Sequence, residues 1–178
     1  MTHEMTDAMA GNPSLYVGTY GKYNNGSLDG EWVDLTQFTD KDAFYDYVKK
    51  LHKDEDDPEF MFQDFQNFPS FLYSERDLDA RLFDWLVVPD DERDYIAAYW
   101  DAIAEDDIDY IKDAFFGCYK DFDHFVNDMV NNCFNHVFRD FPALGIYFDY
   151  EAYGRNLRHD LSVAESAGDG DLTYVWSN

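Results

Sequence analysis

Carboxylates and aromatic rings are both abundant in this sequence, and any fold of the chain must accommodate the two together. The chain has 38 acidic residues against 13 lysines and arginines, which gives a net charge of −25. Aromatic residues make up 19% of the chain. Disordered acidic segments are poor in aromatic residues because they bury no core. The sequence therefore predicts a rigid, folded scaffold that holds carboxylates at fixed positions.

The negative charge is concentrated in the middle of the chain. Residues 1–52 have a net charge of −4, residues 53–109 of −15, and residues 110–178 of −6. The central third also contains large apolar residues such as Trp85 and Trp100, so we expect it to be folded rather than a flexible acidic block. A surface of this sign repels nucleic acids and anionic membranes and attracts basic proteins. We therefore expect no direct binding to nucleic acid or to membranes.

Cysteine usage and the N-terminus predict a cytoplasmic protein. Cys118 and Cys133 fall in patterns typical of buried helix faces, so we expect reduced core thiols. The N-terminus lacks the basic start and the apolar run of an export signal. No stretch approaches the roughly 18 apolar residues that a membrane span needs.

The first 66 residues predict a small α+β unit. Strands are expected at about residues 15–20, 28–35 and 59–65, and the sequence Asn24-Asn25-Gly26 predicts a tight hairpin between the first two. Thr39 or Asp40 is expected to cap a helix. The apolar positions of that helix recur at helical spacing and are Phe44, Tyr47, Val48 and Leu51.

The central segment is predicted to be helical. Residues 74–77 (SERD) are typical of a capping box that precedes a helix with Leu82 and Trp85 on its apolar side. Pro89 fits the first turn of the next helix, where the acids at 90–92 would lie at the positive end of the helix dipole. A third helix is expected from about 106 to 117.

The strongest periodicity lies in the last third of the chain. Apolar residues recur at helical spacing from Phe122 to Val137, which predicts a long amphipathic helix. After it we expect a strand at 145–148 and a short helix at 150–157. A turn at Asp169-Gly170 and a last strand at 172–176 complete the prediction.

No motif in the sequence indicates catalysis or a cofactor. With 38 acids, pairs of carboxylates are unavoidable and do not by themselves indicate acid–base chemistry. The acidic runs at 54–57 and 169–171 do not match a calcium-binding loop. Four residues of zinc-ligand types are present, but their spacing is not that of a zinc motif: Cys118, His124, Cys133 and His136. We therefore predict a binding protein rather than an enzyme.

The charge is large enough for a mimic of DNA. B-DNA carries one charge per about 1.7 Å of its axis, so 25 charges correspond to about 43 Å of duplex. Adaptation to high salt also produces an excess of aspartate, but it predicts acids spread over the entire surface. Composition alone leaves both explanations open.

Three segments resemble the ArdA antirestriction family. Residues 15–26 (LYVGTYGKYNNG) and 28–33 (LDGEWV) resemble its N-terminal region. Residues 116–126 (FGCYKDFDHFV) are similar to its antirestriction motif, and residues 148–157 (FDYEAYGRNL) to another signature of the family. The resemblance covers nearly everything except the N-terminal tail.

This resemblance implies an elongated α+β protein of three small domains, with small antiparallel sheets and helices at both ends and an acidic helical middle. It also implies a homodimer, without enzymatic activity, that mimics bent B-form DNA and occupies the DNA-binding groove of type I restriction-modification enzymes. In this chain we expect a flexible tail (1–13), an N-terminal α+β domain (14–66), a central acidic helical domain (67–105) and a C-terminal α+β domain (106–178) with the dimer contacts.

The carboxylates that replace DNA phosphates are expected in the charge-rich centre. They are Asp54, Asp56, Asp57, Asp77, Asp79, Asp84, Asp90, Asp91, Asp94, Asp101, Glu105, Asp106, Asp107 and Asp109. Two alternative hypotheses stay open at this point. One is an acidic mimic directed at another DNA-binding protein, such as a nucleoid protein or a repressor, and the other is an enzyme adapted to high salt.

Overall fold

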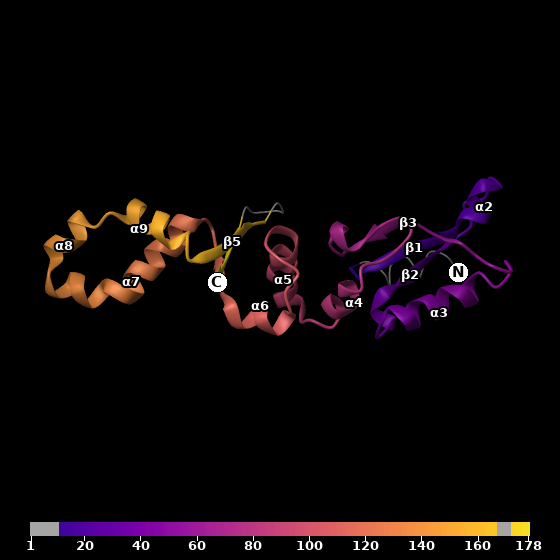
Figure 1. Cartoon of the computed structure of the whole chain (residues 1–178), viewed down its shortest axis with the longest axis horizontal. Helices are drawn as coiled ribbons and strands as arrows, with labels where there is room; N and C mark the ends of the chain where they lie inside the picture. The colour runs from indigo at the N-terminus through magenta and orange to yellow at the C-terminus, as the bar shows by residue number, and fades with distance from the viewer. Residues whose placement is uncertain (1–10, 167–171) are drawn as a thin grey trace. The chain divides into compact units, whose positions relative to one another are not determined.

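Two small antiparallel sheets, each with its own helices, organise the chain (Figure 1). The computed structural model describes residues 11–166 and 172–178. The chain divides into two compact units, Met1–Pro89 and Asp90–Asn178, called here the N-terminal and the C-terminal unit. The predicted α+β class with small antiparallel sheets is confirmed. The predicted central domain, 67–105, spans the boundary between the units, and the three-domain division stays a prediction.

Strand β1 (Ser14–Thr19) is the centre of the N-terminal sheet. It pairs antiparallel with β2 (Glu31–Asp34) on one side and with β3 (Phe60–Gln66) on the other. Leu15 and Val17 of β1 are fully buried. Because alternate side chains of a strand point to the same face, these two residues place the core on one face of the sheet.

A short helix, not a tight turn, connects β1 to β2. Helix α2 (Tyr20–Asn24) follows β1 directly, and the side chain of Thr19 accepts a hydrogen bond from the amide of Lys22. Asn25 caps the end of α2, and Gly26 has a φ of 81°, the left-handed conformation that commonly ends helices. The predicted hairpin turn is therefore wrong, because the Asn-Gly pair ends a helix instead.

Helix α3 (Lys41–Leu51) packs on the N-terminal sheet. The predicted cap is confirmed at Asp40, whose carboxylate accepts a hydrogen bond from the amide of Ala43 at 2.8 Å. The Phe44 ring is fully buried, and its centroid lies 5.9 Å from that of Phe62 in β3. Three short elements complete this unit: η1 (Leu35–Gln37), η2 (Ser70–Leu72) and α4 (Arg81–Leu86).

The predicted capping box at 74–77 is wrong. Ser74 accepts a hydrogen bond from the amide of Asp77 at 3.0 Å and donates its own amide to the carbonyl of Asp77 at 2.9 Å. These bonds close a turn, and Tyr73 and Leu78 form a β-bridge on either side of it. Leu78 is fully buried at the end of this turn, and the amide of Asp79 donates to the carbonyl of Leu72, so the chain is not yet helical there and α4 begins at Arg81.

Strand β6 (Thr173–Ser177) is the centre of the C-terminal sheet, between β4 (Phe115–Tyr119) and β5 (Leu161–Glu165). Trp176 of β6 is fully buried, and its ring contacts Tyr99 with the centroids 5.1 Å apart. This contact packs helix α5 (Asp90–Ala102) against the sheet. Helix α6 (Ile108–Ala114) leads into β4.

Helix α7 (Phe122–Asp140) confirms the predicted amphipathic helix. Phe125, Val126 and Val130 form a core with Val175 of β6. Beyond Val130 the helix packs instead on α8 (Pro142–Tyr147) and α9 (Tyr150–Leu157). None of the helices in the described ranges, α7 included, is long and apolar enough to cross a membrane.

Several local predictions for the C-terminal unit are wrong. The helix expected at 106–117 ends at Ala114, and β4 follows it. The strand expected at 145–148 lies largely in α8, because Pro142 begins a helix there. Strand β5 was not predicted. The last strand is confirmed as β6, whereas the turn expected at Asp169-Gly170 lies outside the described residues.

The predicted burial of the two cysteines is also wrong, because Cys118 and Cys133 are exposed. In the second half of α7 the packed side is formed by Phe134 and Phe138, whose rings contact Phe148. The packed side in the second half of α7 is therefore not the one that packs on the sheet in the first half. Cys133 lies off this second packed side and is exposed. Cys118 lies in the irregular part of β4, next to the register shift that precedes it.

Candidate protein-binding surface

The carboxylates selected from the sequence lie almost entirely on the protein surface. Thirteen of the fourteen are exposed, and only Asp79 is half-buried. Six belong to the N-terminal unit and eight to the C-terminal unit. They occur in four places: the loop after α3, the turn and helix at 77–84, the outer side of α5, and the connection from α5 to α6.

Helix α5 presents its acids on the side opposite its buried residues. Tyr95, Ile96, Tyr99 and Trp100 are buried, whereas Asp90, Asp91, Asp94 and Asp101 are exposed. A helix turns about 100° per residue, so positions 90, 94 and 101 fall on one narrow stripe. Within the described residues, the carboxylates of Asp91, Asp94 and Asp101 form no hydrogen bond or ion pair.

The connection from α5 to α6 is held by its own acids. Asp106 accepts a hydrogen bond from the Tyr99 hydroxyl at 2.9 Å, and its carbonyl accepts one from the Trp100 indole at 2.9 Å. Burial and the Asp106 carboxylate raise the pKa of Tyr99 to about 12, so this hydroxyl remains a donor at neutral pH. Asp107 caps α6 by accepting from the amide of Asp109. Glu105 and the Asp109 carboxylate lie exposed beside them.

Contacts with α3 and with the first residue of α4 fix the acids of the 77–79 segment. The Asp77 carboxylate accepts from Lys41 Nζ at 2.7 Å and from the Tyr45 hydroxyl at 2.8 Å. Partial burial alone would raise the pKa of Asp77, but these two hydrogen bonds outweigh it and lower that pKa. Asp79 accepts from Arg81 at 2.6 Å and 3.0 Å, and the same contact lowers the pKa of Asp79. Asp84 on α4 is exposed.

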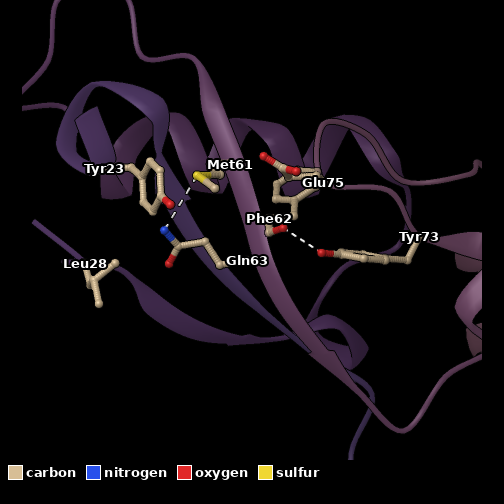
Figure 2. A pocket seen from close by; sticks show the side chains of 7 residues that line it. All are labelled: Tyr23, Leu28, Met61, Phe62, Gln63, Tyr73 and Glu75. Atoms are coloured by element: carbon tan, nitrogen blue, oxygen red, sulfur yellow. Dashed lines mark hydrogen bonds between the residues drawn. The ribbon is translucent and has the colours of Figure 1, made fainter. Parts of the chain in front are cut away.

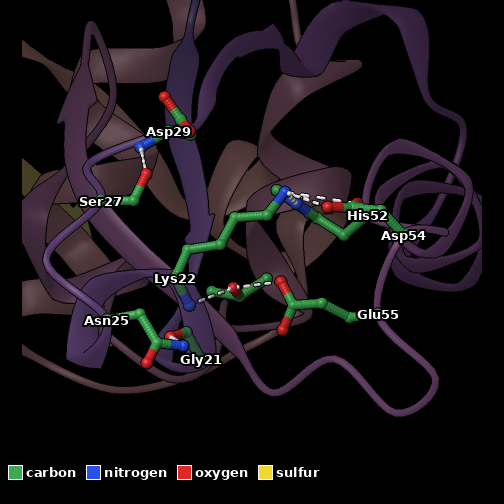
Figure 3. Close-up of polar contacts among 9 residues, drawn as sticks. Gly21, Lys22, Asn25, Ser27, Asp29, His52, Asp54 and Glu55 are labelled. Atoms are coloured by element: carbon green, nitrogen blue, oxygen red, sulfur yellow. Dashed lines mark hydrogen bonds and ion pairs between the residues drawn. The ribbon is translucent and has the colours of Figure 1, made fainter.

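The acidic loop, residues 53–57, is tied to the β1–α2 junction (Figure 3). Lys22 Nζ lies 3.0 Å from the Asp54 carboxylate and 3.2 Å from His52 Nδ1. The Thr19 hydroxyl donates to Glu55 at 2.6 Å. Elsewhere in the loop, Asp56 and Asp57 are exposed, and neither side chain has a hydrogen-bond or ion-pair partner among the described residues.

Five cations pair with these acids or with Glu92, and their own side chains are largely covered. The side chains of Lys22, Lys41, Arg81, Arg93 and Lys112 are only 17–36% exposed, and each is paired with a carboxylate. Arg93 is the most covered, while its partner Asp90 is 91% exposed. The carboxylate is clearly the more exposed partner in three of these pairs, at 60% for Asp54 and Asp77 and 91% for Asp90, whereas Asp79 and Glu92 are only 31% and 28% exposed.

A surface hollow of about 310 Å³ lies beside β3 (Figure 2). Two of its polar side chains, Tyr73 and Glu75, already have partners within the protein. The Tyr73 hydroxyl donates to the carbonyl of Phe62 at 2.6 Å, and Glu75 accepts from the Tyr20 hydroxyl at 2.6 Å. The remaining lining residues are Tyr23, Leu28, Met61 and Gln63. The hydrogen bond from Tyr73 ties β3, at the edge of the sheet, to the segment that follows it.

The residues of zinc-ligand types are not brought together. His124 pairs with Asp121 at 2.7 Å, at the start of α7. Among the described residues, no three His, Cys, Asp or Glu side chains gather closely enough to hold a metal ion.

Sequence reasoning missed the lysines that hold the acids. Lys22 and Asp54 are 32 positions apart, and Lys41 and Asp77 are 36 apart, so no periodic pattern joins them. The sequence gives one hint of such a role, which is that lysines are rare in so acidic a chain. Arg81 could have been found, because it lies two residues from Asp79.

Comparison with known families adds one finding. The model of the antirestriction protein family ArdA matches residues 15–169, which is most of the chain and includes all the acids described above. No individual curated protein matches the chain.

Proposed function

The chain belongs to the ArdA antirestriction family, and we propose that it inhibits type I restriction-modification enzymes by presenting carboxylates where those enzymes bind DNA phosphates. In this proposal the protein binds the DNA groove of its target and carries out no chemistry. It acts in the cytoplasm, where restriction enzymes encounter incoming mobile DNA.

The acid stripe of α5 is the observation that carries the proposal. Asp90 and Asp101 are eleven residues apart, or about 17 Å along the helix axis at 1.5 Å per residue. One strand of B-DNA carries about five phosphates over that length. The stripe of α5 presents three exposed carboxylates over it, Asp90, Asp94 and Asp101, and Asp91 adds a fourth beside the stripe. The helix fixes their spacing, so a basic groove pays little entropy to order them.

The other exposed acids extend the charge available to the partner. The whole chain carries −25, and the cations that pair with the predicted carboxylates, such as Lys41 and Arg93, are largely covered. Lysines and arginines of a DNA groove would meet many carboxylates, each in a weak, exposed ion pair. Such an interface weakens with added salt, because screening reduces every contact.

Exposed apolar residues on and before α8 support a homodimer. Ile146 and Tyr147 are 81% and 84% exposed, and Phe141 and Leu144 are also exposed. Apolar residues gathered on a surface in this way favour burial against a partner. Sedimentation of the wild type should give the mass of two chains, and Ile146→Glu should shift it toward the mass of one. A wild type that stays monomeric at micromolar concentration contradicts the dimer.

Restriction of unmodified phage in cells with a type I system tests the inhibition itself. Expression of the wild type should restore plating, and the purified protein should block DNA cleavage in vitro. The triple variant Asp91→Asn, Asp94→Asn, Asp101→Asn should inhibit about tenfold less or weaker still, because three exposed ion pairs are lost. Its fold should be retained, since none of the three carboxylates has a partner in the described structure.

A matched control separates position from total charge. The control variant Asp113→Asn, Asp160→Asn, Glu165→Gln removes three exposed acids of the same unit and changes the net charge by the same amount. We expect this control to inhibit nearly as well as the wild type. Equal loss in both triple variants would mean that bulk charge alone acts. Competition against unrelated DNA-binding proteins at fixed salt would identify a mimic with a different target.

A further inference from the structure

We propose that Lys22, together with Thr19 and Gly21, is a positioning residue that holds the acidic loop (53–57) in the conformation that the basic partner binds. This inference rests on the proposed function. The basic partner is expected to bind the carboxylates of this protein. The role of Lys22 is therefore indirect, because it orders carboxylates that the partner binds.

The loop contains four consecutive carboxylates and one lysine, a net charge of −3 over five residues. Like charges at this density repel one another, and a loop has no regular backbone hydrogen bonding to oppose that repulsion. Left unsupported, the segment would adopt many conformations, and binding to a partner would be weakened by the entropy lost when the segment becomes ordered.

Contacts from the β1–α2 junction oppose this spreading. Lys22 Nζ lies 3.0 Å from Asp54, and the Thr19 hydroxyl donates to Glu55 at 2.6 Å. The amide of Tyr20 donates to the carbonyl of Glu59 at 2.9 Å and so fixes the chain just beyond the loop. Asp54 and Glu55 are thereby held, and Asp56 and Asp57 next to them remain exposed for a partner.

His52 completes the cluster as an acceptor for the lysine (Figure 3). It is buried at the end of α3, and its Nδ1 lies 3.2 Å from Lys22 Nζ. Burial, and then the charge of Lys22, lower the pKa of His52. The imidazole is therefore neutral at pH 7 and can accept a hydrogen bond from the ammonium group.

Gly21 allows the Glu55 carboxylate to reach Thr19. A Cβ atom on Gly21 would lie 2.6 Å from Glu55 Oε2, which is too close for any real contact. An alanine there would push the flexible Glu55 side chain away from the Thr19 hydroxyl. Because alanine favours helix more than glycine does, α2 itself should not suffer.

The experiment compares Lys22→Met with Lys53→Met in the inhibition of DNA cleavage by a type I enzyme. Both variants change the net charge from −25 to −26. Lys53 is exposed, and its side chain has no ion pair or hydrogen bond within the described residues. If total charge governs binding, both variants should inhibit as well as the wild type or better.

If Lys22 positions the loop, Lys22→Met should inhibit about three- to tenfold less, and Lys53→Met should not. Lys22→Arg should restore most of the inhibition, because a guanidinium can still pair with Asp54. Gly21→Ala should reduce inhibition about two- to threefold with no change in charge. Hydrogen exchange at 54–57 should rise in Lys22→Met and Gly21→Ala only.

The outcomes separate the two proposals. If the wild type does not inhibit, the proposed function fails, and hydrogen exchange still reports whether Lys22 orders the loop. If the wild type inhibits and Lys22→Met matches Lys53→Met, the positioning role is overturned. Should Lys22→Met fail to fold, Gly21→Ala decides the question, and unchanged inhibition and unchanged exchange in that variant reject the inference.

Discussion

The two units of the chain fix their carboxylates in different ways. In the N-terminal unit the acids lie mainly on a loop and a turn, and cations from distant positions hold them, as in Lys22–Asp54 and Lys41–Asp77. In the C-terminal unit the acids of α5 are held by the helix backbone itself. The N-terminal arrangement depends on tertiary contacts, whereas the α5 arrangement is set by regular secondary structure.

This difference shows two solutions to one electrostatic problem. Carboxylates at fixed, close spacing repel one another, and something must oppose that repulsion. A helix does so with backbone hydrogen bonds and with aromatic residues buried on its other side, such as Tyr99 and Trp100. A loop cannot, and it therefore needs the half-buried lysines. The N-terminal acids should consequently be the more sensitive to mutation of their neighbours.

The largest expected effect comes from removing the N-terminal core. Phe44→Ala deletes a fully buried ring and should lower the free energy of unfolding of that unit by about 3–5 kcal/mol. Hydrogen exchange should rise at 53–59 and 74–79, while α5 stays protected. Loss of protection in α5 to the same extent would show that both units hold their acids through one cooperative structure. Phe125→Ala, in the other core, is the reciprocal control.

A smaller effect is expected at Asp77. Asp77→Asn removes the charge that pairs with Lys41 and weakens the hydrogen bond from Tyr45, so the free energy of unfolding should fall by about 1–2 kcal/mol. Asp94→Asn, on α5, should change it by less than about 0.5 kcal/mol, because the Asp94 side chain lacks a described partner. Urea unfolding of both variants measures the contrast. Equal effects would remove the distinction between the two units.

The smallest effect is a pH dependence at Asp79. The Arg81 contact lowers the pKa of Asp79 in the folded state below the ordinary value near 3.9. The resulting stabilisation is complete above about pH 4 and is lost as the pH falls through the lower, folded pKa. The stability difference between the wild type and Asp79→Asn, on the order of 0.5 kcal/mol, should therefore shrink below pH 4. If the difference in the free energy of unfolding between the two proteins is constant from pH 6 to pH 3, the Asp79–Arg81 contact does not stabilise the fold.

Elements with strong periodicity could be predicted from the sequence, and elements chosen by packing could not. The stripes of α3, α5 and α7 set those helices, because each has apolar residues at helical spacing. The Asn-Gly pair at 25–26 fits a hairpin turn and a helix end equally well. In the structure β1 is followed by helix α2, and the pair ends that helix. Strand β5 has a short and weak pattern, and its place comes from pairing with β6.

By itself the sequence determined the α+β class, the folded acidic centre and the exposed side of α5, because periodicity and charge are local properties of the chain. Only the tertiary structure decided which carboxylates are paired and which are free. Asp54 and Asp77 pair with cations more than 30 positions away in the sequence. These pairs also depend on the partial burial of the two lysines, Lys22 and Lys41, beside the acids. Local patterns cannot encode such pairings, since an ion pair forms wherever the folded backbone brings two charges within about 4 Å.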